Sequence, residues 1–326
     1  MRMPHALVTG GAGFIGSHLC EALVERGWHV TCLDNLSTGC RDNISHLKGE
    51  RFSFIEGDVR DGAILEELTD GVDALFHLAA MVSVPMSMEH PLLCHEQNVT
   101  PLLFILNIAR RKGFSIAYAS SSAVYGEGGA KPLKEDDLPA PQSPYGATKL
   151  IDEIYATMAH RAWKVRAVGL RLFNVYGPRQ NPNGEYAAVI PRFIEALTLG
   201  KEVKIYGDGR QMRDFIFVRD VALAFIAAAE RSHRLGGRVF NVASGVAVSI
   251  NELYALISSI IGTTQTPTFE PPRPGDIKYS TADVKTMKAE LGLGEVTPLA
   301  EGLEEMLVYF TERSSAFEER VELKGG

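Results

Sequence analysis

Short apolar runs alternate with longer amphipathic segments through the first half of the chain. The runs have the length and the apolar content of buried strands, and the segments between them repeat their apolar positions with the period of a helix. The pattern predicts strands at 6–8, 30–33, 52–56, 74–78, 116–119 and 165–170, and a first helix over 17–26 that ends at Gly27. Strands that alternate with helices are typical of a doubly wound, parallel α/β sheet.

The pattern changes after about Arg171. Pro and Gly interrupt the second half in G-P-R-Q-N-P-N-G, Y-G-D-G-R-Q-M-R-D-F and E-P-P-R-P-G-D. We therefore expect a first domain over residues 1–171, joined by a return segment near 215–245 that adds a strand at 240–242. The remainder of 172–326 is predicted to form a smaller C-terminal α+β lobe. Ligands of open parallel sheets bind at the carboxyl ends of the strands, so the cleft between the two lobes is the expected substrate site.

Composition narrows the function classes. The 326 residues include 33 basic and 40 acidic side chains, for a net charge of −7, and no basic run suits a nucleic-acid backbone. No apolar stretch reaches the roughly 18 residues of a membrane span, and the N-terminal sequence leads straight into a strand without a signal-peptide pattern. The four cysteines form no C-x-x-C pair, which favours a cytoplasmic protein with reduced thiols and no metal site.

A glycine-rich turn follows the first predicted strand in T-G-G-A-G-F-I-G. Gly10, Gly13 and Gly16 allow a tight turn and a close approach of a pyrophosphate to the backbone and to the helix N-terminus. Asp34 ends the second strand about 20 residues later, where a carboxylate accepts hydrogen bonds from the adenosine ribose and repels a 2′-phosphate. The sequence thus predicts a Rossmann domain that binds NAD in preference to NADP. Asp58, in G-D-V, is predicted either to meet the adenine amino group or to cap a turn.

A second motif, S-P-Y-G-A-T-K, places Tyr145 and Lys149 one helical turn apart. A free tyrosine has a pKa of ~10, and lowering it by ~3 takes roughly 4 kcal/mol. One positive charge at ~4 Å supplies about that much at an effective dielectric constant of ~20. With the glycine motif, this pair predicts hydride exchange between a nicotinamide and an alcohol carbon, while Tyr145 moves the hydroxyl proton. One hydroxyl of Ser120, Ser121 and Ser122 is expected to hydrogen-bond the reacting oxygen.

Taken together, the motifs resemble those of the extended short-chain dehydrogenase/reductases, and within them the NAD-dependent nucleotide-sugar epimerases. The resemblance rests on T-G-G-A-G-F-I-G-S-H-L, G-D-V-R-D, H-L-A-A, S-S-S-A-V-Y-G, S-P-Y-G-A-T-K, L-R-L-F-N-V-Y-G-P-R-Q, G-D-G-R-Q-M-R-D-F-I-F-V-R-D-V and R-P-G-D. It implies that Ser121, Tyr145 and Lys149 are catalytic. The predicted cofactor-binding residues are Gly10, Gly13, Phe14, Ile15, Gly16, Asp34, Asn35, Asp58, Val59, Leu78, Ala79, Ala80, Asn98, Tyr145 and Lys149.

The resemblance also implies a nucleotide diphosphate in the second lobe. Asn174, Arg213 and Arg273 would surround the diphosphate, Tyr206 would stack on the base, and Asp276 would hold its ribose. Arginine forks suit a pyrophosphate, and an aromatic face suits a pyrimidine. The predicted substrate-binding residues are Ser83, Ser121, Ser122, Asn174, Val189, Tyr206, Arg213, Arg273, Asp276 and Ser280.

Departures from related enzymes narrow the expected reaction. Ser122 and Ala123 stand where 4,6-dehydratases carry an acid pair, and uronate decarboxylases also place a Glu there. Pro85 stands where uronate epimerases have an Arg. Ser280 falls at the family's size gate, where a small residue leaves room for a 2-acetamido group. If the motif is counted one residue differently, Tyr279 is the gate and the substrate range is narrow.

These observations lead to one expected function and two alternatives. We expect epimerisation at C4 of a UDP-hexose, with UDP-glucose and UDP-galactose as substrates and UDP-N-acetylhexosamines as a wider range. Another NAD-dependent nucleotide-sugar enzyme, namely a dehydratase, decarboxylase or reductase, is the first alternative, and a non-catalytic nucleotide-sensing protein is the second. The resemblance also suggests a homodimer through helices near 91–111 and 145–161.

Overall fold

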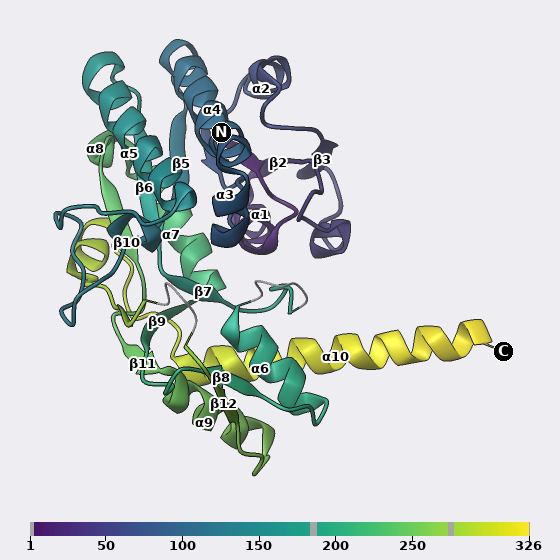
Figure 1. Ribbon diagram of the computed structural model, residues 1–326. Coiled ribbons are helices and arrows are strands. Elements are labelled where there is room, and N and C mark those ends of the chain that lie inside the picture. The colour runs from purple at the N-terminus through teal and green to yellow at the C-terminus, as the bar shows by residue number, and fades with distance from the viewer. Residues whose placement is uncertain (1–2, 183–187, 273–276, 326) are drawn as a thin grey trace.

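A seven-stranded parallel sheet forms the first lobe of the computed structural model, which describes residues 3–182, 188–272 and 277–325 (Figure 1). Its strand order is β10-β6-β5-β4-β1-β2-β3, and every pair of neighbours is parallel. The predicted doubly wound α/β sheet is therefore confirmed. The strands are β1 (His5–Thr9), β2 (His29–Asp34), β3 (Phe52–Glu56), β4 (Ala74–His77), β5 (Ser115–Ser121), β6 (Ala167–Leu172) and β10 (Val239–Val242).

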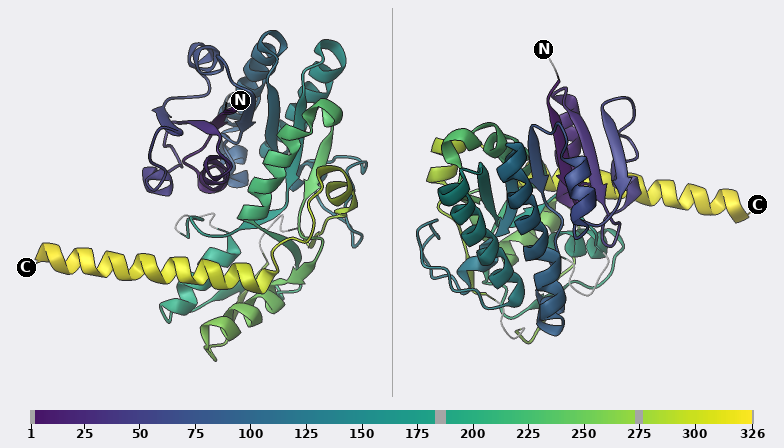
Figure 2. Two further views of the ribbon diagram at one scale, coloured as in Figure 1. Left: turned by 180° about the vertical axis from the view of Figure 1, so that it is seen from behind. Right: turned by 90° about the horizontal axis from the view of Figure 1, so that it is seen from above.

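Helices cover both faces of this sheet (Figure 2). Ala6 and Val8 of β1 belong to the core on one face, and Leu7 between them belongs to the core on the other. Burial on both faces is the reason that the strands read as unbroken apolar runs. One face carries α1 (Phe14–Glu25), α7 (Val218–Glu230) and α8 (Ser232–Leu235), and the other carries α2 (Gly62–Leu68), α3 (Val84–Glu89), α4 (Pro91–Lys112) and α5 (Pro144–Trp163).

The first helix begins earlier than its sequence pattern predicts. α1 starts at Phe14 instead of Ser17, and its N-cap is Gly13, which has no side chain to mark the start. The predicted end at Gly27 agrees with the structure, because this glycine follows the C-cap with a φ of +80°. A helix that opens directly from the glycine turn points its free N–H groups at the carboxyl edge of the sheet.

The second lobe lies below that edge (Figure 1). A separate core fills it, and β10 returns to the large sheet beside β6, as predicted. Its small sheet contains β7 (Asn174–Tyr176), β9 (Met212–Phe217), β11 (Ala247–Ser249) and β13 (Tyr279–Ser280), and β8 (Lys204–Tyr206) pairs with β12 (Thr268–Glu270). Its helices are α6 (Val189–Thr198), α9 (Ile250–Ile261) and α10 (Leu299–Gly325). The short helical turns η1 (Arg41–Ile44), η2 (Ser122–Tyr125) and η3 (Met287–Leu291) pack against elements of the first lobe.

Helix α10 extends far beyond the body of the protein in both views of Figure 2. Despite its length, neither α10 nor any other helix within the described ranges is long and apolar enough to cross a membrane.

A buried ion pair joins a strand, a helix and a short helical turn of the first lobe. Arg171 of β6 donates to both carboxylate oxygens of Glu153 on α5, at 2.9 and 2.7 Å. Its third nitrogen donates to the hydroxyl of Tyr125 in η2 at 2.8 Å. These contacts hold β6, α5 and η2 together near the carboxyl ends of β5 and β6.

Candidate active site

A cavity of about 510 Å³ opens at the carboxyl edge of the large sheet. It brings together almost the whole predicted cofactor set from segments far apart in the sequence. Ser121 also lines the cavity, as one of the predicted catalytic residues. The predicted cofactor residues on its wall are Gly10, Gly13, Phe14, Ile15, Gly16, Asp34, Asn35, Asp58, Val59, Leu78, Ala79, Ala80, Tyr145 and Lys149.

Gly10 and Gly16 of the glycine turn have no room for a side chain. Gly10 has a φ of +71°, and a Cβ on it would lie 2.7 Å from the backbone nitrogen of Ala79. A Cβ on Gly16 would lie 2.1 Å from the carbonyl oxygen of Gly10. The bare backbone and the N-terminus of α1 together form a cradle that suits a pyrophosphate.

Asp34 is held rigidly at the end of β2. Its Oδ2 accepts from the N–H of Ala12 at 3.0 Å, and its Oδ1 accepts from the N–H of Leu36 at 2.8 Å. Burial raises the pKa of this carboxyl, and the backbone N–H donors, including that of Gly13, pull it back down. A carboxylate fixed in this way suits the ribose hydroxyls of a dinucleotide and opposes a phosphate in their place.

Asp58 lies on the same wall but is already partnered. Arg60 donates to it at 2.7 Å and is the main reason that the pKa of Asp58 is lowered to about 2. Asn35 donates to the same carboxylate oxygen, Oδ2, at 3.1 Å. The guanidinium group of Arg60, which also lines this wall, is therefore paired with a carboxylate and does not favour a 2′-phosphate.

Asn98 and Ser83 are among the predicted residues that lie outside the cavity lining. Asn98 of α4 is completely buried, and its amide both accepts from the N–H of Met81 at 2.7 Å and donates to the Met81 carbonyl at 3.1 Å. It thereby fixes the loop that carries Ala79 and Ala80. Ser83 caps α3, accepting from the N–H of Met86 at 3.2 Å.

The Tyr/Lys pair stands at the start of α5. Ser143 caps this helix, and the backbone N–H of Tyr145 donates to Ser87 at 3.2 Å. One turn later, Lys149 is only 2% exposed, and its Nζ donates to Asp152 Oδ2 at 3.5 Å. The helix thus places a phenol on the cavity wall with a buried ammonium group one turn behind it.

The three serines at the end of β5 have different surroundings. Ser120 donates its hydroxyl to Glu153 at 2.5 Å, so this hydroxyl is already engaged. Ser121 accepts from the N–H of Ala123 at 3.1 Å, which leaves its hydroxyl hydrogen to be donated into the cavity. Ser122 begins η2 and does not line the cavity.

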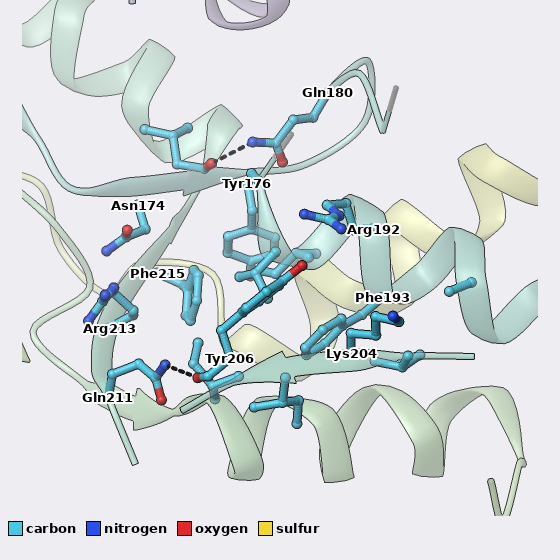
Figure 3. Close-up of a pocket in the computed structure, with 18 of the residues that line it drawn as sticks. Asn174, Tyr176, Gln180, Arg192, Phe193, Lys204, Tyr206, Gln211, Arg213 and Phe215 are labelled. Carbon is cyan, nitrogen blue, oxygen red and sulfur yellow. Dashed lines mark hydrogen bonds between the residues drawn. The ribbon is translucent and has the colours of Figure 1, made fainter. Parts of the chain in front are cut away.

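A second cavity, of about 520 Å³, lies in the smaller lobe and shares Val175 and Gln180 with the first. Figure 3 shows Tyr206 reaching into it, with Asn174 and Arg213 on one side and Arg192 on the other. Asn174, Val189, Tyr206 and Arg213 of the predicted substrate set line it, whereas Ser280 lines neither cavity. Arg273 and Asp276 lie outside the described residues.

Several lining residues were not predicted. Gln180 stands in the quoted motif G-P-R-Q, and its amide donates to the Val175 carbonyl at 3.1 Å where the two cavities meet. Arg192 and Lys204 also line the second cavity but belong to no quoted motif, and Lys204 pairs with Glu270 at 2.9 Å. Their position depends on the core of the smaller lobe, to which α6 and β8 both contribute and which the sequence pattern does not reveal.

Comparisons with known proteins agree with this geometry. The model of the NAD-dependent epimerase/dehydratase family matches residues 6–243. A UDP-glucose 4-epimerase of Mycolicibacterium smegmatis is 38% identical over 312 residues, covering 94% of this chain and 99% of that protein. A UDP-N-acetyl-alpha-D-glucosaminuronate decarboxylase of Bacillus cytotoxicus is 38% identical over 256 residues, 76% of this chain and 77% of that protein.

Among solved structures, the chain is similar to a UDP-N-acetylglucosamine 4-epimerase from Methanobrevibacter ruminantium, which was solved in complex with UDP-N-acetylmuramic acid. The TM-score is 0.91 and the identity is 39%, with 96% of this chain and 100% of that chain covered. The fold and the cofactor cradle define an NAD-dependent enzyme with a Rossmann sheet. The chain belongs to the NAD-dependent epimerase/dehydratase family.

The position of Asp34 generates a prediction about cofactor choice. Asp34→Ala should weaken NAD binding by about 10-fold or more, since a hydrogen bond to a charged group contributes roughly 1.5–3 kcal/mol. NADP should bind better than it does to the wild type, because the opposing charge is gone. The dissociation constants of both cofactors, measured by calorimetry, check this.

Glu56→Gln is the matched control, because Glu56 ends the adjacent strand β3 but lies outside the cavity. Equal preference for NAD in Asp34→Ala and Glu56→Gln would show that Asp34 does not select the cofactor.

Proposed function

We propose that this protein epimerises a UDP-hexose at C4, through a transient 4-keto sugar. UDP-glucose and UDP-galactose are the proposed substrates, and UDP-N-acetylglucosamine and UDP-N-acetylgalactosamine form a wider range. The observation that supports the proposal is that Ser121, Tyr145 and Lys149 all line the cofactor cavity, which shares Val175 and Gln180 with the second cavity.

In the proposed reaction, Tyr145 and Ser121 hydrogen-bond the O4 hydroxyl of the sugar. Tyr145 removes its proton as a general base. Lys149 favours the ionised phenol through its charge and also holds the nicotinamide ribose. NAD, when bound, would supply a reversible hydride acceptor for either face of C4, and Gly10, Gly13, Gly16 and Asp34 would hold it. Tyr145 gives the proton back to O4 when the alcohol is restored, so no net oxidation occurs.

The second cavity is the proposed site of the UDP group. Arg213 offers a planar donor set to the diphosphate, and the ring of Tyr206 offers a face on which a uracil can stack. Asn174 is held beside them, with its amide donating to the Asp214 carbonyl at 2.8 Å. A nucleotide in this cavity would direct its sugar through the junction at Gln180 toward Tyr145.

The alternatives differ in the chemistry that they need. A decarboxylase or dehydratase of this family would use a carboxylate next to Ser121, but Ser122 and Ala123 supply none. A nucleotide-sensing protein would not need the buried charge behind Tyr145. These features favour epimerisation.

Incubation of the purified protein with UDP-glucose, UDP-N-acetylglucosamine and UDP-glucuronate tests the proposal. Proton NMR should show inversion at C4 of at least one neutral sugar, with no loss of carbon dioxide or water and no consumption of NAD. Release of carbon dioxide from UDP-glucuronate, without inversion of either neutral sugar, would replace this proposal with a decarboxylase.

Tyr145→Phe should reduce turnover by at least about 100-fold and leave NAD binding unchanged, since general acid–base catalysis contributes roughly 10²–10⁴-fold. Tyr155→Phe, on the same helix but outside the cavity, is the control and should retain activity. Steady-state rates with the epimerised sugar provide the measurement. Normal turnover in a Tyr145→Phe variant that retains NAD would exclude Tyr145 as the base.

Neither Ser280 nor Tyr279 lines either cavity, but the register of the small sheet favours Ser280 as the residue nearer the sugar path. Ser280 of β13 is the parallel partner of Arg213 on β9, whereas Tyr279 is the partner of Met212. Side chains of paired residues project to the same face of a sheet. Ser280 is therefore expected to share the face from which Arg213 enters the second cavity.

Ser280→Tyr should lower the preference for UDP-N-acetylglucosamine over UDP-glucose by roughly 5- to 150-fold, because overpacking typically costs ~1–3 kcal/mol. The kcat/KM values for both sugars measure this preference. Tyr279→Phe is the control, and its ratio should remain that of the wild type. An unchanged ratio in Ser280→Tyr would remove Ser280 from the sugar site, and the argument for N-acetylhexosamines with it.

We also propose a homodimer through α4 and α5, which pack side by side on one face of the sheet. Leu92, Phe104 and Ile154 expose 81%, 39% and 59% of their surface on these helices, as a dimer interface would require. Ile154→Arg should lower the molar mass in light scattering from dimer to monomer. Leu138→Arg, at a loop residue that is 89% exposed, should leave the mass unchanged. A wild-type protein that is monomeric at all concentrations would contradict the proposal.

A further inference from the structure

The carboxylate of Asp152 has no part in the mechanism described above, although it contacts the catalytic lysine. It lies on α5 less than one turn after Lys149, and its Oδ2 accepts from Lys149 Nζ at 3.5 Å. Both side chains are buried, with exposed fractions of 3% for Lys149 and 1% for Asp152. Its other oxygen, Oδ1, is buried and has no hydrogen-bond partner among the described residues.

The other titratable groups around this pair are neutral or already paired. His77 of β4 has its pKa lowered to about 3 by burial and by Lys149, so it carries no charge at neutral pH. Burial raises the pKa of Cys94 on α4 and that of Tyr118 on β5. Glu153, the next residue along α5, is held by Arg171 of β6.

Tyr125 of η2 is also neutral, because burial raises its pKa to about 12, and its hydroxyl is bound by Arg171. Within the described part of the chain, Asp152 is thus the carboxylate available to balance the charge of Lys149. A buried ammonium group without a counter-charge is costly and readily loses its proton. Burial raises the pKa of Asp152 to about 7 and Lys149 pulls it down, so the carboxylate gains its charge as the pH rises above neutrality.

We propose that Asp152 is a positioning residue that keeps Lys149 protonated and directed toward Tyr145 in the alkaline part of the working pH range. This inference rests on the proposed function, since it concerns the same Tyr145 and Lys149. A lysine that stays charged at high pH continues to favour the ionised phenol and to hold the nicotinamide ribose.

Asp152→Asn tests the inference, because it preserves the size of the side chain and removes only its charge. Removing a negative charge lowers the pKa of a nearby ammonium, and an opposite charge at this range is worth roughly 1–3 pH units. The alkaline limb of the kcat/KM profile should therefore move to lower pH by roughly 1–3 units. The acid limb should move less, since Asp152 is largely protonated there.

Calorimetric binding of NAD supplies a readout that does not depend on turnover. The loss of NAD affinity at high pH should begin at a pH lower by the same amount in Asp152→Asn. Asp152→Glu, which keeps the charge, should hold both profiles closer to those of the wild type. A uniform loss of activity in Asp152→Asn, with both limbs and the NAD profile in place, would show a purely structural role and overturn the inference.

Thr157→Val is the matched control on the same helix, since it removes the hydrogen bond from Thr157 to the Gly237 carbonyl at 3.0 Å, away from the cavity. It should lower stability without moving either limb, and a limb that moved as far as in Asp152→Asn would also count against the inference.

The two proposals fail in different ways. A wild type without epimerase activity contradicts the proposed function, whereas an active wild type with an unshifted Asp152→Asn variant contradicts only the role of Asp152.

Discussion

Lys149 carries an ammonium group into the interior of the first lobe, and the elements around it are arranged so that the charge is tolerated. Strand β4 places a neutral His77 near it, α4 contributes a neutral Cys94, and α5 supplies Asp152. The same helix carries Tyr145 to the wall of the cofactor cavity. A solvated lysine would influence a phenol weakly, because water screens its charge. The burial of Lys149 is therefore essential to the role proposed for this pair.

The carboxyl edge of the parallel sheet brings the remaining groups to that pair. The glycine turn follows β1, Asp34 ends β2 and Ser121 ends β5, and all of them line the cavity. The second lobe adds a separate cavity that meets the first at Val175 and Gln180. One end of a bound molecule can thus be recognised in the smaller lobe while its other end reacts beside the cofactor.

The predicted groups that line the cofactor cavity depend on short-range geometry. The glycine turn and the four-residue spacing of Tyr145 and Lys149 fix their neighbours through backbone constraints alone, so the motif predicts the arrangement. Asn98 does not line the cavity, because its amide is used by the Met81 backbone, a contact between a helix and a loop. The sequence did not predict a role for Asp152, because an aspartate in an amphipathic helix is normally exposed to solvent. Here the packing of α5 against α4 and β5 buries it. Contacts of this kind depend on long-range packing, so a local sequence pattern does not predict them.

Transfer of the C4 hydrogen to the cofactor and back is the central claim, and an isotope label follows it most directly. UDP-glucose with deuterium at C4 would be incubated with the NAD-loaded protein in ordinary water, and the product examined by NMR and mass spectrometry. Hydride return from a cofactor that stays bound predicts a product inverted at C4 that keeps its deuterium there. Replacement of the deuterium by hydrogen from water would mean that C4 is inverted by proton exchange, and would contradict the account.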